Sequence, residues 1–193
     1  MTDKVSELGE LLKALHRRRD DELRSTYNRS LPFADAQFDR WERATVLGFG
    51  EKTSIYDSSI VMGDVRVGAN TWIGPFTMLD GSGGGLTIGD YVSISSGVHI
   101  YTHDTVLWAV SGGVQAARKG AVSIGSNTYI GAQAVIIAGV TIGSRCVIAA
   151  NSLVNRDVLD GTIVGGTPAR HLGRVEGEGA DARLVYDGKE ATI

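Results

Sequence analysis

The sequence has little of several residue types, and each shortage excludes a class of protein. Its 193 residues include a single cysteine, Cys146, and only three prolines. One cysteine excludes a disulfide framework and a cysteine-rich zinc site. A formal net charge of −3 provides no global positive field that would attract nucleic acid. No apolar run approaches the roughly 20 residues that a membrane-spanning helix needs.

The N-terminal part predicts a helix over residues 3–27 and then a connector, together residues 1–52. Apolar side chains recur there at the three- and four-residue spacing of an amphipathic helix: Val5, Leu8, Leu11, Leu12, Leu15 and Leu23. Pro32 prevents the helix from continuing. The segment is charged and lacks the apolar core of a signal peptide, so we expect a cytoplasmic protein.

A six-residue repeat begins at Ile55 and continues through most of the remaining chain. Its aliphatic anchors are Ile55, Val61, Val67, Ile73, Leu79, Ile88, Ile94, Ile100, Ile124, Ile130, Ile136, Ile142, Ile148 and Val154. A period of six fits neither one helix nor one long strand, and indicates a short strand plus a corner, repeated. The 26 glycines suit many tight corners. We therefore predict an all-β parallel solenoid of three sides over residues 53–165, in which each anchor stacks on the third anchor after it.

The positions between the anchors predict what lies inside and outside this solenoid. Small or β-branched residues stand four places after most anchors, where they would point inward near a corner; Cys146 is one of them, so we expect it to pack rather than react. Residues at the fifth place would point outward and include Trp72, Met78, Tyr129, Val135, Val147 and Leu153. An outward apolar stripe indicates an interface. A three-sided prism suits a closed homotrimer.

The repeat is interrupted twice. The step from Leu79 to Ile88 holds three extra residues around "GSGGG", which we interpret as a coil insertion because the Lys and helix pattern of a phosphate loop are missing. The step from Ile100 to Ile124 is four hexads long: the expected hexad and three extra hexads. Three hexads make one full turn of a three-sided coil, so the phase of the coil is preserved. The second interruption follows His103, and predicts a protruding loop over residues 105–121 beside that imidazole.

The hexads resemble those of the hexapeptide-repeat acyltransferases, over about residues 45–173. "GVHIYTHDT" is similar to the catalytic-histidine segment of the sugar and xenobiotic acetyltransferase branch, and "IGAQAVIIAGVTIGSRCVIAANSLVNRDV" with "GGTPARHLGR" is similar to its coenzyme A half. "YNRSLPF", "WERATVLGFG" and "LDGSGG" resemble segments of polysaccharide-cluster sugar acyltransferases. The resemblance implies a left-handed parallel β-helix, a homotrimer with sites between subunits, and acetyl-CoA or another acyl-CoA as co-substrate.

The resemblance implies roles for His103 and Asp80, and position in the repeat or loop indicates candidate roles for three residues nearby. His103 would be the general base, a role that suits an imidazole because its ordinary pKa lies near neutrality. Asp80 would contact the acceptor, or stabilise a turn. His99 would contact the acceptor or pack in an interface. Asp104 is a candidate for the acceptor site, where it would orient a neighbouring group, or else it would bind loop amides. Trp108 would cover the acceptor or thioester, or pack on a neighbouring chain.

The coenzyme contacts implied by the resemblance lie in the C-terminal half, with the tail at 166–193 completing the site. They are Ala132, Ala150, Asn155, Arg156 and Arg170, and the need for small residues along the coenzyme adds Gly131. Small residues would let the amide-rich pantetheine arm approach a coil edge, and Arg156 and Arg170 would meet phosphate. The alternative for these arginines is an ordinary exposed charge.

Taken together, the sequence predicts an acyl-CoA-dependent acyltransferase that modifies a hydroxyl or amine of a sugar, such as a sugar nucleotide or a surface-polysaccharide precursor. Two alternatives keep the fold: an acetyltransferase for serine, an antibiotic or another small amine, and a non-catalytic scaffold. A carbonic anhydrase of this architecture would need three histidines around zinc, but the repeat holds only His99 and His103. We expect no metal, no nucleic acid and no membrane span.

Overall fold

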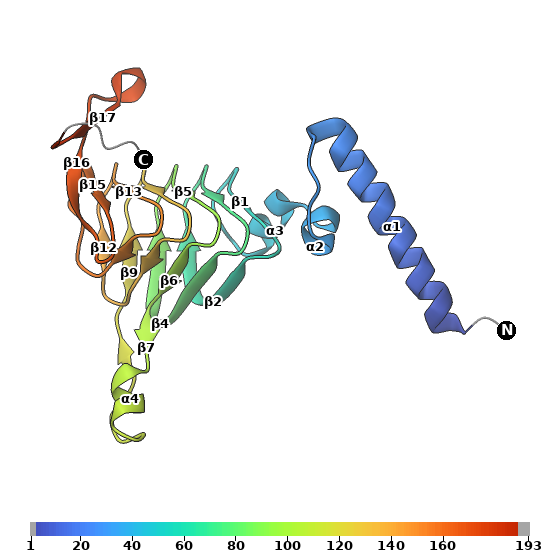
Figure 1. Ribbon diagram of the computed structural model, residues 1–193, viewed down its shortest axis with the longest axis horizontal. Coiled ribbons are helices and arrows are strands. Elements are labelled where there is room, and N and C mark those ends of the chain that lie inside the picture. The colour runs from blue at the N-terminus through green and yellow to red at the C-terminus, as the bar shows by residue number, and fades with distance from the viewer. Residues whose placement is uncertain (1–2, 189–193) are drawn as a thin grey trace.

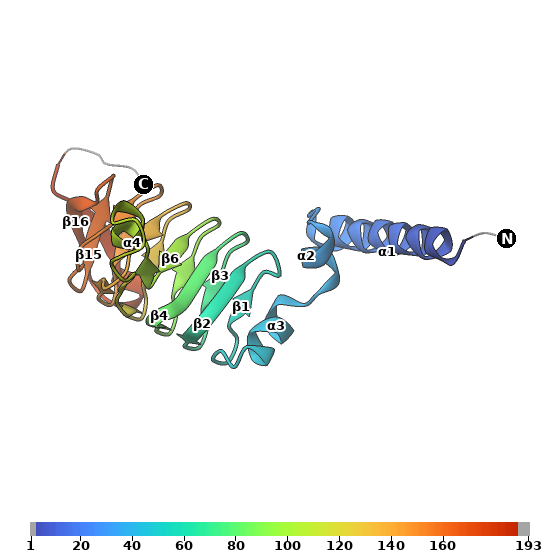
Figure 2. The same cartoon turned by 90° about the horizontal axis from the view of Figure 1, so that it is seen from below.

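The computed structural model describes residues 3–188. The N-terminal part is a long helix that projects away from the rest of the molecule (Figures 1 and 2). Helix α1 (Lys4–Tyr27) begins after Asp3, whose carboxylate accepts a hydrogen bond from the backbone N–H of Val5, and ends at Asn28 in the left-handed conformation. The helix predicted over residues 3–27 is thus confirmed. Two short helices that the sequence did not predict follow it, α2 (Phe33–Gln37) and α3 (Arg40–Val46).

The rest of the chain winds into a parallel β-helix of short strands (Figures 1 and 2). One sheet pairs β1 (Ser54–Ile55), β3 (Trp72–Ile73), β5 (Ser93–Ile94), β10 (Tyr129–Ile130), β13 (Val147–Ile148) and β15 (Thr162–Gly165). A second covers two sides, because β2 (Ile60–Val67) and β4 (Met78–Ile88) continue around a corner; it also contains β6 (His99–Tyr101), β9 (Val122–Ile124), β11 (Val135–Ile136), β12 (Thr141–Ile142) and β14 (Leu153–Val154). Partners such as Ile55 and Ile73 are separated by three hexads, as the repeat predicts.

The predicted anchors form the core of the coil stack. All of them are buried except Val61 on the first coil, which is half-buried. Burial of each aliphatic side chain contributes about 1.5–3 kcal/mol, so the stack is held mainly by this central column.

The small residues after the anchors point inward and bond to the backbone of the next coil. The hydroxyls of Ser59, Thr71 and Thr128 donate to the carbonyls of Gly74, Gly89 and Gly143 at 2.9–3.1 Å. Cys146 is 1% exposed and its thiol donates to the Leu159 carbonyl at 3.1 Å. Burial raises the pKa of this thiol, so the neutral packing role predicted for it is confirmed.

The predicted outward stripe is correct except at one position. Trp72, Met78, Val135 and Leu153 are half-buried and Tyr129 is exposed, but Val147 is buried. Val147 lies in register between Tyr129 and Ile163 on the two neighbouring strands, so side chains on both sides cover it.

The second interruption forms an antiparallel hairpin that projects from the coil stack (Figure 1). Strand β7 (His103–Asp104) pairs with β8 (Arg118–Lys119), and α4 (Val106–Val110) lies between them. The chain re-enters in phase, since His99 pairs with Val135 on the next coil. The projecting segment was predicted as residues 105–121; its helix was not.

The C-terminal residues fold back on the last coil. Strand β16 (Arg170–Glu176) pairs antiparallel with β15 and with β17 (Arg183–Tyr186), and the turn η1 (Gly179–Asp181) connects β16 to β17. Residues 189–193 of the predicted tail lie outside the described residues.

Candidate active site

His103 lies where the hairpin leaves the coil stack, next to the glycine-rich insertion of the preceding coil. Asp80 is in register with Tyr101, so the corner after β6 lies beside the turn that follows Asp80. Gly83 permits this close approach, because a Cβ atom there would lie 2.1 Å from the Thr102 carbonyl oxygen and 2.7 Å from the His103 Cβ. The backbone N–H of Gly83 donates to the Thr102 hydroxyl at 2.8 Å. The glycine-rich insertion therefore positions His103, the residue after which the second interruption begins.

His103 and Asp80 form a dyad. The Nδ1 atom of His103 lies 2.7 Å from Oδ2 of Asp80; the imidazole is 36% exposed and the carboxylate is fully buried. Apart from this contact, Oδ2 has no hydrogen-bond partner among residues 3–188. The other oxygen, Oδ1, accepts from the backbone N–H and the hydroxyl of Ser82, at 2.9 and 2.5 Å.

The electrostatics of the dyad keep Asp80 ionised. Burial by itself would raise the pKa of this carboxyl, but the hydrogen bonds from Ser82, the adjacent His103 and the Thr102 backbone outweigh it, so the pKa is lower than usual. An ionised carboxylate accepts a proton-bearing partner, which assigns the imidazole proton to Nδ1. Nε2 is then the atom able to accept a proton from a substrate.

The side chain of Asp80 is 0% exposed and faces the imidazole. Its contact with an acceptor stays a prediction. The alternative that Asp80 stabilises a turn is correct, because Oδ1 binds the backbone two residues later.

His99 lies on the outward side of β6, half-buried, in register with Met78 and Val135. Tyr101 places its hydroxyl 3.2 Å from His99 Nδ1, with the two rings edge to face at 5.9 Å. His99 thus lies on the same strand that leads to His103, and its ring is fixed by a tyrosine that the sequence reasoning did not single out.

Asp104 fastens the base of the hairpin. Its carboxylate lies 3.1 Å from the Arg118 guanidinium and accepts from the backbone N–H of Val106 at the start of α4. Arg118 also donates to the Ala138 carbonyl at 3.0 Å. The alternative that Asp104 binds loop amides is therefore confirmed, and its acceptor contact stays a prediction.

Trp108 lies on α4, in the projecting hairpin, and is 53% exposed. It is accompanied by other exposed apolar side chains, Val106, Leu107 and Val110. The contact of Trp108 with a substrate or a neighbouring chain stays a prediction.

The predicted coenzyme residues fall into two groups. Asn155, Arg156 and Arg170 line one hollow of about 290 Å³, at the end of β14. Gly131, Ala132 and Ala150 lie at another corner, where the Asn151 backbone N–H donates to the Ala132 carbonyl. A Cβ atom at Gly131 would lie 2.5 Å from the Ala150 nitrogen, so coil packing itself requires this glycine.

The hollow and the dyad share one corner of the prism. Gly139 N–H donates to the Gly120 carbonyl at the end of the hairpin, and Ile137 N–H donates to the Val154 carbonyl just before Asn155. Successive coils therefore bring residues 101–121, 137–139 and 155–157 to the same corner. This places two of the predicted coenzyme residues along the edge from which His103 projects.

The sequence reasoning missed Ser82, Tyr101 and Arg118. A serine two places after an aspartate is a signal for a local side-chain turn, and it was available in "LDGSGG". Within residues 3–188 no group of three or more His, Cys, Asp or Glu side chains is placed to hold a metal ion. The described helices include none long and apolar enough to cross a membrane.

Comparison with known proteins shows which family this chain resembles. Residues 121–156 match the bacterial transferase hexapeptide family (six repeats). Together with the solved structures below, this confirms the predicted resemblance to hexapeptide-repeat acyltransferases and the left-handed parallel β-helix.

Three similar proteins illustrate the class. A mutant of AntD, an N-acyltransferase from Bacillus cereus in complex with dTDP and coenzyme A, has a TM-score of 0.60 at 26% identity, over 65% of this chain and 72% of AntD. The hexapeptide-repeat acetyltransferase VCA0836 from Vibrio cholerae has a TM-score of 0.53 at 27% identity, over 86% of this chain and 91% of that one. Protein CapG of Staphylococcus aureus is 39% identical over 99 residues, 47% of this chain and 54% of CapG. The chain spans about half the length or less of most curated relatives it matches.

Proposed function

We propose that this chain is an acyl-CoA-dependent acyltransferase that transfers an acetyl group to a hydroxyl or amine of a sugar, either a sugar nucleotide or a surface-polysaccharide precursor. The observation that carries the proposal is the dyad: a half-exposed imidazole held at Nδ1 by a buried, ionised carboxylate. The similarity to AntD, which was solved with dTDP and coenzyme A, supports a sugar-nucleotide acceptor.

The reaction needs only one proton acceptor from the protein. Nε2 of His103 removes the proton of the acceptor hydroxyl or amine as its oxygen or nitrogen attacks the thioester carbonyl. The tetrahedral intermediate then expels the coenzyme thiolate, which takes the proton from the imidazolium. Asp80 holds the imidazole in the required tautomer and stabilises its positive charge during the step. The acyl group passes directly from thioester to acceptor.

Coenzyme A would lie along the corner that carries the dyad. Asn155, Arg156 and Arg170 would bind its polar and phosphate groups at the 290 Å³ hollow, and the two arginines supply the charge that phosphate requires. Ala132 and Ala150 belong to another corner of the same chain, so they would meet the coenzyme of a different site. That arrangement is consistent with a homotrimer whose sites lie between subunits, in which one chain supplies His103 and its neighbour supplies Ala132 and Ala150.

The test is the His103→Ala variant, assayed with acetyl-CoA by the release of free thiol in the presence of sugar and sugar-nucleotide acceptors. Loss of a general base reduces turnover by about 10²–10⁴-fold, while the Michaelis constant for acetyl-CoA should stay near the wild-type value. Turnover close to wild type would remove His103 from the mechanism. Acetyl-CoA at 100 times its dissociation constant should stabilise the wild-type fold by about 2.7 kcal/mol, and a scaffold would show no such shift.

A further inference from the structure

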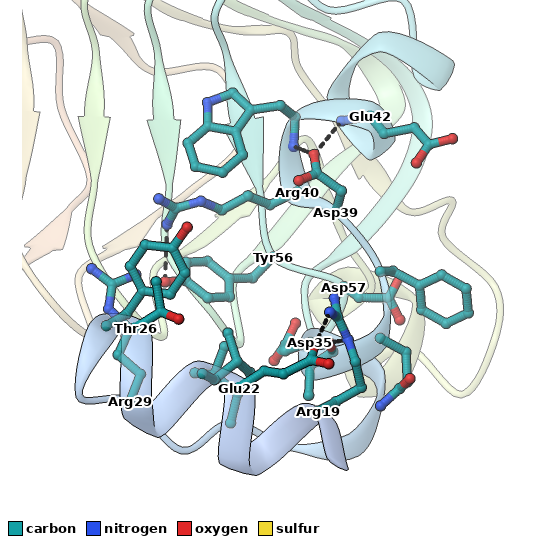
Figure 3. A pocket seen from close by; sticks show the side chains of 17 residues that line it. Arg19, Glu22, Thr26, Arg29, Asp35, Asp39, Arg40, Glu42, Tyr56 and Asp57 are labelled. Carbon is teal, nitrogen blue, oxygen red and sulfur yellow. Dashed lines mark hydrogen bonds and ion pairs between the residues drawn. The ribbon is translucent and has the colours of Figure 1, made fainter. Parts of the chain in front are cut away.

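A second hollow, of about 670 Å³, lies between the N-terminal helices and the first coil (Figure 3). Side chains from α1, α2, α3 and the corner after β1 line it. This volume is within the range of small-molecule sites. Within one chain it lies at the N-terminal end of the prism, away from the hairpin that begins at His103 (Figure 1).

Asp35 and Gln37, both on α2, line this hollow, and each has a buried side-chain atom without a partner in the described part of the chain. Asp35 is 8% exposed; its Oδ1 accepts from the Ser58 backbone N–H at 2.9 Å, and its Oδ2 has no hydrogen-bond partner within the described part of the chain. The Nε2 amide of Gln37 is likewise unpaired there. A buried carboxylate oxygen without a donor costs free energy, because folding removes its water and returns nothing. The same short helix thus carries one acceptor, on Asp35, and one donor, on Gln37, that have no partner in the described residues.

Aromatic rings fixed by an arginine form another part of the lining. The Arg40 guanidinium lies over the Trp41 ring at 4.1 Å and over the Tyr56 ring at 5.2 Å, and it donates to the Tyr56 hydroxyl at 3.0 Å. Figure 3 shows Arg40 and Tyr56 bridged in this way. Tyr27, at the end of α1, adds a third ring that is 64% exposed. Flat apolar surfaces beside hydrogen-bonding groups suit a ligand with apolar faces and a polar rim.

The charge of the lining disfavours an anion. Acids outnumber bases, and the charged side chains are Arg19, Arg29, Arg40, Glu22, Asp35, Asp39, Glu42 and Asp57. Arg19 is already paired with Glu22 at 2.7 Å, and Arg40 is engaged by the aromatic rings. A free phosphate would therefore meet net negative charge, whereas the hydroxyls of a neutral polyol can both donate to Asp35 and accept from Gln37.

We propose that this hollow binds a neutral carbohydrate ring, a site separate from the transfer site at His103. A ligand hydroxyl donates to Oδ2 of Asp35, another accepts from the Gln37 amide, and a face of the ring lies against the aromatic side chains. The proposal is independent of the transfer reaction, because it is tested by binding alone.

The experiment titrates the full chain with D-glucose, D-galactose, N-acetyl-D-glucosamine and cellobiose at millimolar concentration, and separately with inorganic phosphate, by saturation-transfer NMR and calorimetry. Two variants probe the hollow: Asp35→Asn, which keeps an acceptor for Ser58 N–H, and Tyr27→Ala, which alters only an exposed ring. The matched control is Tyr91→Ala, since Tyr91 is equally exposed, 62% against 64%, and does not line the hollow. Melting temperatures verify that each variant is folded.

The expected result is binding of at least one saccharide that weakens about tenfold in both hollow variants and is unchanged in Tyr91→Ala and His103→Ala. Absence of binding by every saccharide, or binding that neither hollow variant weakens, would overturn the proposal. So would loss of binding in His103→Ala, which would assign the sugar to the transfer site, or binding of phosphate alone.

Discussion

Replacing Asp80 with asparagine tests the dyad by changing one atom while preserving its shape. The Ser82 N–H and hydroxyl both donate to Oδ1, so the amide oxygen of the new side chain would stay at that position and its NH₂ group would face the imidazole. Nδ1 of His103 would then have to accept, which moves the imidazole proton to Nε2 and abolishes its capacity as a base. The whole contribution of a general base, about 10²–10⁴-fold or roughly 3–5 kcal/mol of the barrier, should be lost from kcat.

The assay is thiol release under saturating acetyl-CoA and acceptor, with the Michaelis constant for acetyl-CoA and the melting temperature as controls for folding. Ser82→Ala is the matched variant: it removes one donor to Oδ1 but keeps the backbone N–H and the carboxylate, so kcat should fall less than about tenfold. Because the pKa of Asp80 is lower than usual, protonation of this carboxyl should not limit kcat near neutral pH. A kcat for Asp80→Asn within about threefold of wild type would refute the tautomer argument.

Two further predictions concern the coenzyme hollow and the glycine insertion. Arg156→Ala and Arg170→Ala should each raise the Michaelis constant for acetyl-CoA about tenfold and leave kcat nearly unchanged, measured by initial rates; a matched control is Arg66→Ala, an exposed arginine outside the hollow. Gly83→Ala should destabilise the fold by about 3 kcal/mol or more in urea unfolding, because its Cβ would overlap the Thr102 carbonyl, whereas Gly9→Ala, with nothing within 4 Å, should not destabilise; equal melting of the two would contradict the close approach.

The β-helix could be predicted because its sequence signal is strict. Each anchor occupies the same inward position on successive coils, so a period of six fixes which side chains are buried. Among the anchors, the structure departs from this pattern only at the half-buried Val61. The two short helices α2 and α3 were missed because five and seven residues are too few to display a helical period.

The sequence predicted His103 as the base, but not its contact with Asp80. His103 was identified because the repeat stops there, but its partner Asp80 lies on the preceding coil, directly after Leu79, which is in register with Ile100. The insertion was recognised as an irregularity of one coil. The insertion determines which residues face His103 through the backbone path of residues 81–85. The six-residue repeat does not predict that path.

The chain returns to the prism at the side from which the hairpin leaves, so the coils below and above pair as though nothing had intervened. The pairing of the coils therefore does not depend on residues 105–117. The length and sequence of this segment can change at little cost to folding. Under the proposed function, changes confined to residues 105–117 would alter the acceptor while His103 and the coenzyme hollow stay in place.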